Sequence, residues 1–310
     1  MPSAYDMSGA PENAARPRVS KKTTIIGTDE LYLIQQNGSL PTTLAAGNAP
    51  GESGVSLLRT RFRDGVHFSA TPRQHLIWFQ LSTMRIECRR AGRKLTQEVS
   101  MGSLAICPAG IDCAADAEEG GDAILVAVDP GQLALATVEH SAPDAQLIER
   151  LSGYDNALLE LARILAEESA SDYPNGPLFW NESASAFVGR LAARHTSEHE
   201  SQTRGRLGKR VLGRLRDYII AHLDEPIAVA ALASIVGRSP YHFSRVFSRS
   251  VGISPHRYVV HLRLQRAIEL IRDGRSSLAE IAARTGFADQ SHLSRWVRRV
   301  HGVTLTQVVR

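Results

Sequence analysis

The feature that most constrains this chain is an internal repeat in its C-terminal third. The segment His242-Phe243-Ser244-Arg245 recurs 50 residues later as His292-Leu293-Ser294-Arg295, and Leu232-Ala233 recurs 49 residues later as Ile281-Ala282. Gly237 recurs in the same way as Gly286. A fixed sequence period marks one supersecondary unit that is used more than once. The repeat therefore predicts two copies of a small helical unit.

The first copy is predicted to be a helix-turn-helix over residues 229–250. Its first helix ends at Gly237, because glycine takes the left-handed cap conformation without a Cβ penalty. Ser239 then caps the second helix, and Pro240 opens it without losing a needed hydrogen-bond donor. Along that helix the buried stripe is Phe243, Val246 and Phe247.

The second copy is predicted over residues 277–300, with Gly286 in the turn and Asp289 capping the next helix. Its inward side chains are Leu293, Trp296, Val297 and Val300. A helix from Ser254-Pro255 to Asp273, stopped at Gly274, joins the two copies. About 20 helical residues span roughly 30 Å. That length is close to the ~34 Å of one DNA turn, which would place two helices in successive major grooves.

The side chains left on the outer faces carry the chemistry of DNA recognition. Arginine pairs with guanine, Gln, Ser and His reach other base edges, and Ser and Arg hold phosphates. We expect DNA contacts from Ser239, Tyr241, His242, Ser244, Arg245, Arg249, Gln290, Ser291, His292, Ser294, Arg295 and Arg298. Basic amphipathic helices also occur in domains that bind no nucleic acid. The repetition in register and the joining helix favour double-stranded DNA as the partner.

The charge is divided unequally along the chain. Residues 207–310 contain 17 Lys and Arg against 7 Asp and Glu, whereas the remaining residues contain 19 basic and 25 acidic side chains. A basic segment attached to an acidic one indicates a polyanionic partner for the C-terminal segment alone. A basic surface can also be a solvated face, so the charge supports the repeat and does not replace it.

Residues 209–310 resemble the DNA-binding domain of AraC/XylS-type regulators. The resemblance lies in LAxxxGRSPYHFSRVFSRSVGISPHRYV, then RLQRAIELI, then IAARTGFADQSHLSRWVRRVHGVT. It implies a transcriptional regulator, commonly a homodimer with an N-terminal barrel that binds a small effector. The chain departs from the family pattern at Leu305, Val308, Trp296 and Val297, which puts stability more than DNA binding in doubt.

Residues 23–140 read as short strands separated by turn signals, which is typical of an antiparallel sandwich or barrel. The expected strands include 56–62, 75–81, 84–90, 103–109 and 123–129. The run from Gly102 to Gly110 resembles the GxLxxxPxG turn of cupin-like barrels.

Residues 141–197 predict a helical hairpin, with helices over 144–169 and 178–197. Its leucine stripe needs a partner, either the barrel or a second subunit, and we expect dimerisation there. The polar segment 198–208 is the expected linker, and residues 1–22 form an expected flexible arm that does not resemble a secretory signal. The predicted fold class is α+β multidomain: a cupin-like β-barrel with a helical hairpin, then an all-α double helix-turn-helix domain.

The candidate effector-binding residues are polar side chains on the expected strands: Arg61, Arg63, Trp78, Gln80, Arg85 and Arg89. Alternating arginines on a strand usually face solvent. Arg85, Arg89 and Arg93, spaced by four, could instead bind an anionic ligand such as a carboxylate or a phosphate. The barrel could also serve only for dimerisation.

Nothing in the sequence indicates catalysis. The barrel region has only His67, His75 and His140, without HxH spacing, and the chain has no GxSxG, P-loop or HExxH motif. We expect no cofactor and no metal, and a cupin-type enzyme fused to a DNA-binding module is the disfavoured alternative. Three cysteines without CxxC spacing predict ordinary thiols in a reducing cytoplasm. No apolar run reaches the ~18 residues of a membrane span.

Overall fold

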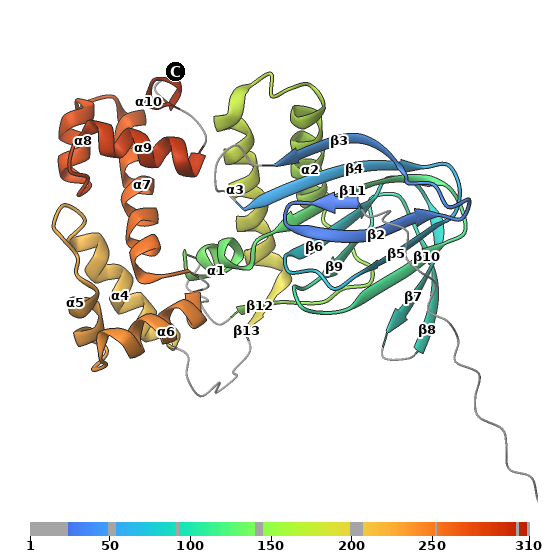
Figure 1. Ribbon diagram of the computed structural model, residues 1–310, viewed down its shortest axis with the longest axis horizontal. Helices are drawn as coiled ribbons and strands as arrows, with labels where there is room; N and C mark the ends of the chain where they lie inside the picture. The colour runs from blue at the N-terminus through green and yellow to red at the C-terminus, as the bar shows by residue number, and fades with distance from the viewer. Residues whose placement is uncertain are drawn as a thin grey trace, which may run out of the picture.

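The computed structural model describes residues 24–48, 54–90, 93–139, 145–198, 207–251, 253–301 and 304–308. A strand-rich half and a helical half lie side by side, with helix α3 (Gly176–His195) between them (Figure 1). This arrangement confirms the fold class predicted from the sequence. The expected N-terminal arm and nearly all of the expected linker lie outside the described residues.

The strand-rich half is built from two antiparallel sheets. The first has the order β1-β2-β5-β10-β7-β8 and the second has the order β3-β4-β11-β6-β9. The strands of the first sheet are β1 (Thr24–Ile26), β2 (Asp29–Gln35), β5 (Val66–Ala70), β10 (Cys113–Ala117), β7 (Met84–Arg90) and β8 (Arg93–Val99). Those of the second are β3 (Thr42–Asn48), β4 (Val55–Phe62), β11 (Gly121–Val128), β6 (His75–Gln80) and β9 (Leu104–Cys107).

The five strands expected from alternating apolar runs are confirmed as β4, β6, β7, β9 and β11. The central strand β11 pairs with β4 on one side and β6 on the other, and its residues from Ala123 to Val128 are fully buried. Burial on both faces explains why this strand reads as a continuous apolar run. One face contributes Leu125 to the core between the sheets, and the other contributes Ile124 and Val126 to a second core.

The second core shows what the leucine stripe of the helical hairpin packs against. Helices α2 (Asn156–Ala170) and α3 cover the outer face of the five-stranded sheet, and their Leu158, Leu165, Phe187 and Leu191 are completely buried there. The partner of the stripe is therefore the barrel of the same chain. Leu158, Leu165 and Leu191 are therefore not available to a dimer interface, whereas Leu161 of the same stripe is half-buried.

The start of the hairpin differs from the prediction. Residues Ala145–Leu147 form β12, which pairs with β13 (Thr196–Glu198), and α2 begins only after Asp155. The Asp155 carboxylate accepts the N–H of Leu158 at 3.0 Å, Arg190 Nε at 2.6 Å and a hydrogen bond from His195 Nε2 at 3.1 Å. This buried carboxylate fixes the helix start and joins α2 to the end of α3.

The helical half has seven helices among its described residues. They are α4 (Lys209–Ala221), α5 (Val229–Ile235), α6 (Pro240–Val251), α7 (Pro255–Asp273), α8 (Leu278–Arg284), α9 (Gln290–His301) and α10 (Leu305–Val308). Two hydrophobic clusters divide them, one around α4, α5 and α6 and one around α8, α9 and α10, and α7 contributes to both. Leu305 and Val308, which depart from the family pattern, are buried in the second cluster.

Helix α1 (Pro130–Glu139), which follows the last barrel strand, connects the two halves and was not predicted. Its Leu135 is 4% exposed and belongs to the hydrophobic cluster of the first helix-turn-helix unit. Leu178 of α3 packs against the cluster of the second unit. The halves therefore share apolar contacts at two separate places. No helix among the described residues has the length and hydropathy needed to cross a bilayer.

Candidate nucleic-acid interface

The first helix-turn-helix unit consists of α5 and α6. Gly237 adopts a φ of 64°, and the N–H of His242 donates to Ser239 Oγ at 3.4 Å, so the predicted turn and N-cap are both present. Phe243, Val246 and Phe247 are buried as predicted. The residues predicted to face outward do so: Tyr241, His242, Arg245 and Arg249 are exposed, and Ser244 is half-buried.

Tyr241 is the most exposed large hydrophobic side chain among the described residues, at 74%. The Arg245 guanidinium lies over its ring, 5.8 Å from the centroid, which holds the arginine along the solvent face of α6. The His242 ring contacts the side chain of Arg238 in the turn before the helix. These groups form a basic and aromatic surface at the N-terminal end of α6.

The second unit consists of α8 and α9. Ser277 and Glu280 form a reciprocal capping box at the start of α8, and the Asp289 carboxylate accepts the N–H of His292 at 2.7 Å at the start of α9. The predicted Asp289 cap is therefore present. Gln290, Ser291, Arg295 and Arg298 are exposed on α9, as predicted.

Two predicted contact residues of α9 are less available. Ser294 is half-buried, and His292 is half-buried with both ring nitrogens in contact with its own unit. The N–H of Ala288 lies 3.2 Å from His292 Nδ1, and Trp296 Nε1 lies 3.0 Å from His292 Nε2. Helical periodicity predicted that His292 faces outward. In the structure its ring nitrogens instead contact the backbone of Ala288 and the indole of Trp296.

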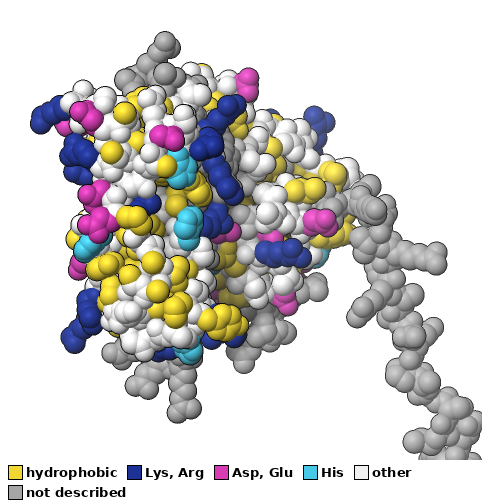
Figure 2. All heavy atoms as spheres, turned by 60° about the vertical axis from the view of Figure 1, so that its left-hand side comes forward, with side chains coloured by type: hydrophobic (Ala, Val, Ile, Leu, Met, Phe, Trp, Pro, Cys, Tyr) yellow, Lys and Arg dark blue, Asp and Glu magenta, His cyan; other side chains and the backbone are white. Residues whose placement is uncertain are grey.

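Helix α7 fixes the separation of the two units. It has 19 residues, or about 29 Å at 1.5 Å per residue. Ser254 accepts the N–H of Arg257 at its start, and Gly274 ends it with a φ of 67°, both as predicted. Lys and Arg side chains lie along the outer edge of the helical half and in a column beside its boundary with the barrel (Figure 2).

Comparison with known proteins finds relatives of the C-terminal segment. A family model described as a helix-turn-helix domain matches residues 232–310. The chain is 36% identical over 91 residues to "Probable transcriptional regulator LumQ" of Photobacterium leiognathi. The matched segment covers 29% of this chain and 37% of that protein. Residues 232–310 therefore form a helix-turn-helix domain. It lies in the segment that resembles the AraC/XylS-type regulators, and it is called the AraC-type domain below.

Two solved structures extend the comparison. A Chromobacterium violaceum regulator with an AraC-type DNA-binding domain is 27% identical and covers 33% of this chain and 90% of that chain, with a TM-score of 0.31. ToxT from Vibrio cholerae is 11% identical and covers 83% of this chain and 99% of that chain, with a TM-score of 0.34. The chain spans only 37% of the length of LumQ in that match.

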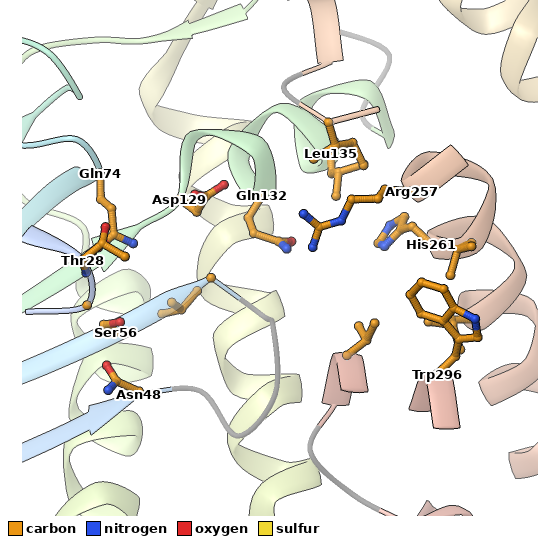
Figure 3. A pocket seen from close by; sticks show the side chains of 17 residues that line it. Thr28, Asn48, Ser56, Gln74, Asp129, Gln132, Leu135, Arg257, His261 and Trp296 are labelled. Carbon is orange, nitrogen blue, oxygen red and sulfur yellow. Dashed lines mark hydrogen bonds between the residues drawn. The ribbon is translucent and has the colours of Figure 1, made fainter. Parts of the chain in front are cut away.

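A cavity of about 430 Å³ separates the AraC-type domain from the barrel. Arg257 and His261 of α7 and Trp296 of α9 line one side, and barrel-side residues such as Gln74 line the other (Figure 3). The amide of Gln132, from α1, points toward the Arg257 guanidinium. Trp296 and Val300 therefore do not point only into the domain core as predicted, because both also line this cavity.

A second cavity, of about 120 Å³, lies inside the barrel. Of the predicted effector residues, Trp78 and Gln80 line it: Trp78 Nε1 donates to Gln80 Oε1 at 2.8 Å, and Gln80 Nε2 lies 2.7 Å from Met84 Sδ. The rest of the wall is mainly apolar, with Phe62, Phe68, Ile86 and Leu125 among its side chains.

The predicted arginines do not line this cavity. Arg61, Arg63 and Arg85 are exposed, and Arg61 forms an ion pair with Asp122 of the neighbouring strand at 2.7 Å. They alternate with inward residues such as Phe62 and so lie on the outer faces of the sheets. The side chain of Arg89 lies outside the described residues.

The arginine that does line the barrel cavity is Arg150, which the sequence did not single out. Its Nε is buried and has no hydrogen-bond partner among the described residues. The backbone N–H of Arg150 donates to Ile106 O at 3.0 Å, which holds the residue beside β9. Among the described residues, no group of three or more His, Cys, Asp or Glu side chains is placed to hold a metal ion.

Proposed function

We propose that this protein is a sequence-specific DNA-binding transcriptional regulator whose helices α6 and α9 enter successive major grooves of double-stranded DNA. The carrying observation is that one AraC-type domain presents two basic helix ends, exposed at Arg245 and Arg295 and joined by α7. In helix-turn-helix proteins the N-terminal part of the second helix contacts the bases.

The proposed contacts follow from exposure and chemistry. Arg245 and Arg295 pair with guanine, and Gln290, Ser291 and His242 reach other base edges. Contacts to phosphates come from Ser239, Tyr241, Ser244, Arg249, Ser294 and Arg298. His292 acts mainly by supporting the turn of the second unit, because its ring already contacts Ala288 and Trp296.

The test is selection of bound fragments from a random DNA library with the full-length protein. We expect an enriched sequence with two conserved blocks about 10 base pairs apart, since one DNA turn separates successive major grooves. Enrichment of a single block would overturn the two-groove arrangement. Absence of any enriched sequence would overturn sequence-specific binding.

The barrel cavity supports a small-molecule effector with an apolar body and an anionic group. The walls are mainly apolar, Trp78 Nε1 donates to Gln80 Oε1, and the Gln80 amide nitrogen contacts Met84 Sδ. Arg150 supplies a buried guanidinium nitrogen without a partner among the described residues. An anion at Arg150 would gain a charge-assisted hydrogen bond. Binding would then bias the arrangement of the DNA-binding domain through the contacts of Leu135 and Leu178.

A thermal-shift screen of small aromatic and aliphatic carboxylic acids tests this effector site. We expect a stabilising acid whose effect is lost in Ala115→Leu, which fills the cavity, and kept in Arg85→Ala, which changes the outer face. If no acid changes either the melting temperature or the affinity for DNA, the alternative of an effector-independent regulator is preferred.

Homodimerisation is also part of the proposal, with the interface moved away from the buried leucine stripe. The solvent face of the hairpin keeps apolar side chains, including Phe179 at 38% exposure. Analytical ultracentrifugation of the intact chain should show a dimer, and a monomer at tens of micromolar protein would overturn the proposed homodimerisation.

Elemental analysis tests the remaining alternative, a cupin-type enzyme fused to a DNA-binding module, because such an enzyme would carry stoichiometric metal.

A further inference from the structure

All three cysteines of the chain line the barrel cavity. Cys88 lies in β7, Cys107 at the end of β9 and Cys113 at the start of β10. Cys88 is buried, whereas Cys107 and Cys113 are half-buried at one end of the sandwich. Thiols from three strands therefore line one cavity, and two of them are partly exposed.

A short turn brings Cys107 and Cys113 together. Residues 108–112 cross from one sheet to the other, because β9 belongs to the five-stranded sheet and β10 to the six-stranded sheet. The N–H of Gly110, whose φ is 80°, donates to Pro72 O at 2.7 Å, and the N–H of Ala109 donates to His75 Nδ1 at 3.1 Å. The turn is thus tied to the loop before β6, and the two thiols are held at its base.

The environment of the thiols gives them different roles. Cys107 Sγ lies 3.5 Å from Ile111 O, and Cys113 Sγ lies 3.6 Å from Ala70 O. A hydrogen bond between the two thiols, together with burial, raises the pKa of Cys113. Burial and this contact disfavour the thiolate form of Cys113, so we assign the first attack on an oxidant to Cys107 and the resolving step to Cys113.

We propose that Cys107 and Cys113 form a reversible thiol–disulfide pair at the barrel cavity, oxidised by hydroperoxides and reduced by small thiols. The Cys107 thiolate attacks the distal peroxide oxygen, the O–O bond breaks, and the alkoxide leaves as the alcohol after taking a proton. The Cys113 thiol then attacks the resulting sulfenic acid, forming the S–S bond and releasing water. Two thiols are oxidised as one hydroperoxide is reduced.

The disulfide would join the two sheets at one end of the sandwich. The sheets are otherwise held there by turns and side-chain packing, so a covalent link between β9 and β10 changes the shape of the cavity wall. Cys88 has no part in this reaction. Cys88 is buried on β7, where it pairs with Ala115 of the neighbouring strand β10. Burial raises the pKa of its thiol.

The test is thiol mapping of the native full-length protein after treatment with hydrogen peroxide. Free thiols are alkylated with N-ethylmaleimide under denaturing conditions, and peptides are identified by mass spectrometry. We expect peroxide to block alkylation at two of the three cysteines and to produce a peptide that links Cys107 to Cys113. Dithiothreitol should reverse both changes completely. Cys88→Ser is the matched control and should retain the linked peptide, whereas Cys107→Ser and Cys113→Ser should each lose it.

The wild-type peptide map decides the proposal even if a variant fails to fold. A linked peptide that contains Cys88 would overturn it. Conversion of Cys107 to sulfinic or sulfonic acid without a linked peptide would overturn it as well, because Cys113 would then not act as the resolving thiol. None of these measurements involves DNA, so their outcome is separate from that of the regulator assignment.

Discussion

The guanidinium of Arg263 donates from Nη1 to the carbonyl oxygen of Gly286 at 2.8 Å. Its Nη2 donates to the carbonyl oxygen of Glu225 at 2.6 Å. Arg263 lies near the middle of α7, and Gly286 forms the turn of the second helix-turn-helix unit. Glu225 lies in the loop between α4 and α5 that leads into the first unit. Burial lowers the pKa of Arg263, an effect opposed by Asp224. One side chain therefore links both units to the helix that separates them.

Removing this side chain should loosen the two units. Arg263→Ala leaves two carbonyl oxygens without their charged donor and should lower the free energy of unfolding by about 1–3 kcal/mol. Arg266→Ala is the matched control, because Arg266 lies on the same helix in an exposed ion pair with Glu269 and should change stability by less than about 1 kcal/mol. Urea denaturation compares them, and equal losses would contradict the link.

The two turn glycines should differ in their tolerance of a side chain. Gly237 and Gly286 have φ values of 64° and 73°, so alanine at either position pays the cost of the left-handed conformation, about 1–2 kcal/mol. A Cβ at Gly237 meets open space, whereas a Cβ at Gly286 would overlap the carbonyl oxygen of Leu223. Gly286→Ala should therefore lower the melting temperature more than Gly237→Ala. The reverse order would show that the turn can move away from α4.

Replacing the exposed arginines should weaken specific DNA binding. Arg245→Ala and Arg295→Ala should each cost about 1–3 kcal/mol on the selected DNA sequence if each arginine pairs with a base. Arg61→Ala, which removes an arginine from the barrel surface, should leave the affinity unchanged. Fluorescence anisotropy at fixed salt measures all three. If neither domain variant weakens binding, the proposed docking face is wrong.

The buried carboxylate of Asp155 should make stability depend on pH. Burial alone would raise its pKa, but hydrogen bonds from Arg190, the Leu158 N–H and His195 outweigh burial and lower it. Asp155 therefore stabilises the fold above the pKa of an unfolded aspartate, near ~4, and this contribution is lost as pH falls through the lower folded-state value.

Asp155→Asn tests this dependence. The variant should be less stable than wild type by about 1–3 kcal/mol at pH 7, because Arg190 and His195 lose a charged acceptor. The difference should shrink as the pH falls below ~4, where wild type loses the same charge. Urea denaturation between pH 3 and 7 measures it, and a difference that does not change with pH would exclude the carboxylate as its source.

The DNA-binding face was largely accessible from the sequence because it rests on local interactions. Helical periodicity separates Phe243 and Phe247 from Arg245, and the caps at Ser254, Gly274 and Asp289 depend on residues within one turn. Residue identity and spacing are sufficient for such features. His292 is the exception, because the same periodicity does not report that a neighbouring indole and backbone N–H engage its ring.

The barrel residues show where this reasoning fails. Alternation on a strand separates two faces but does not say which face encloses the cavity, so Trp78 and Gln80 were grouped with Arg61 and Arg85, which face solvent. Arg150 lies outside the strands of both sheets and lines the cavity, and no periodic pattern in the sequence predicts this.

The sequence by itself determined the repeat, the two helix-turn-helix units, their caps and the length of the joining helix, since each follows from neighbours along one helix. Only the tertiary structure decided that the leucine stripe covers the barrel, that Leu135 enters the cluster of the first unit, that Arg263 links both units and that Cys107 and Cys113 line one cavity. These contacts join residues from different elements, and their partners are selected by the packing of whole faces, which no local pattern encodes.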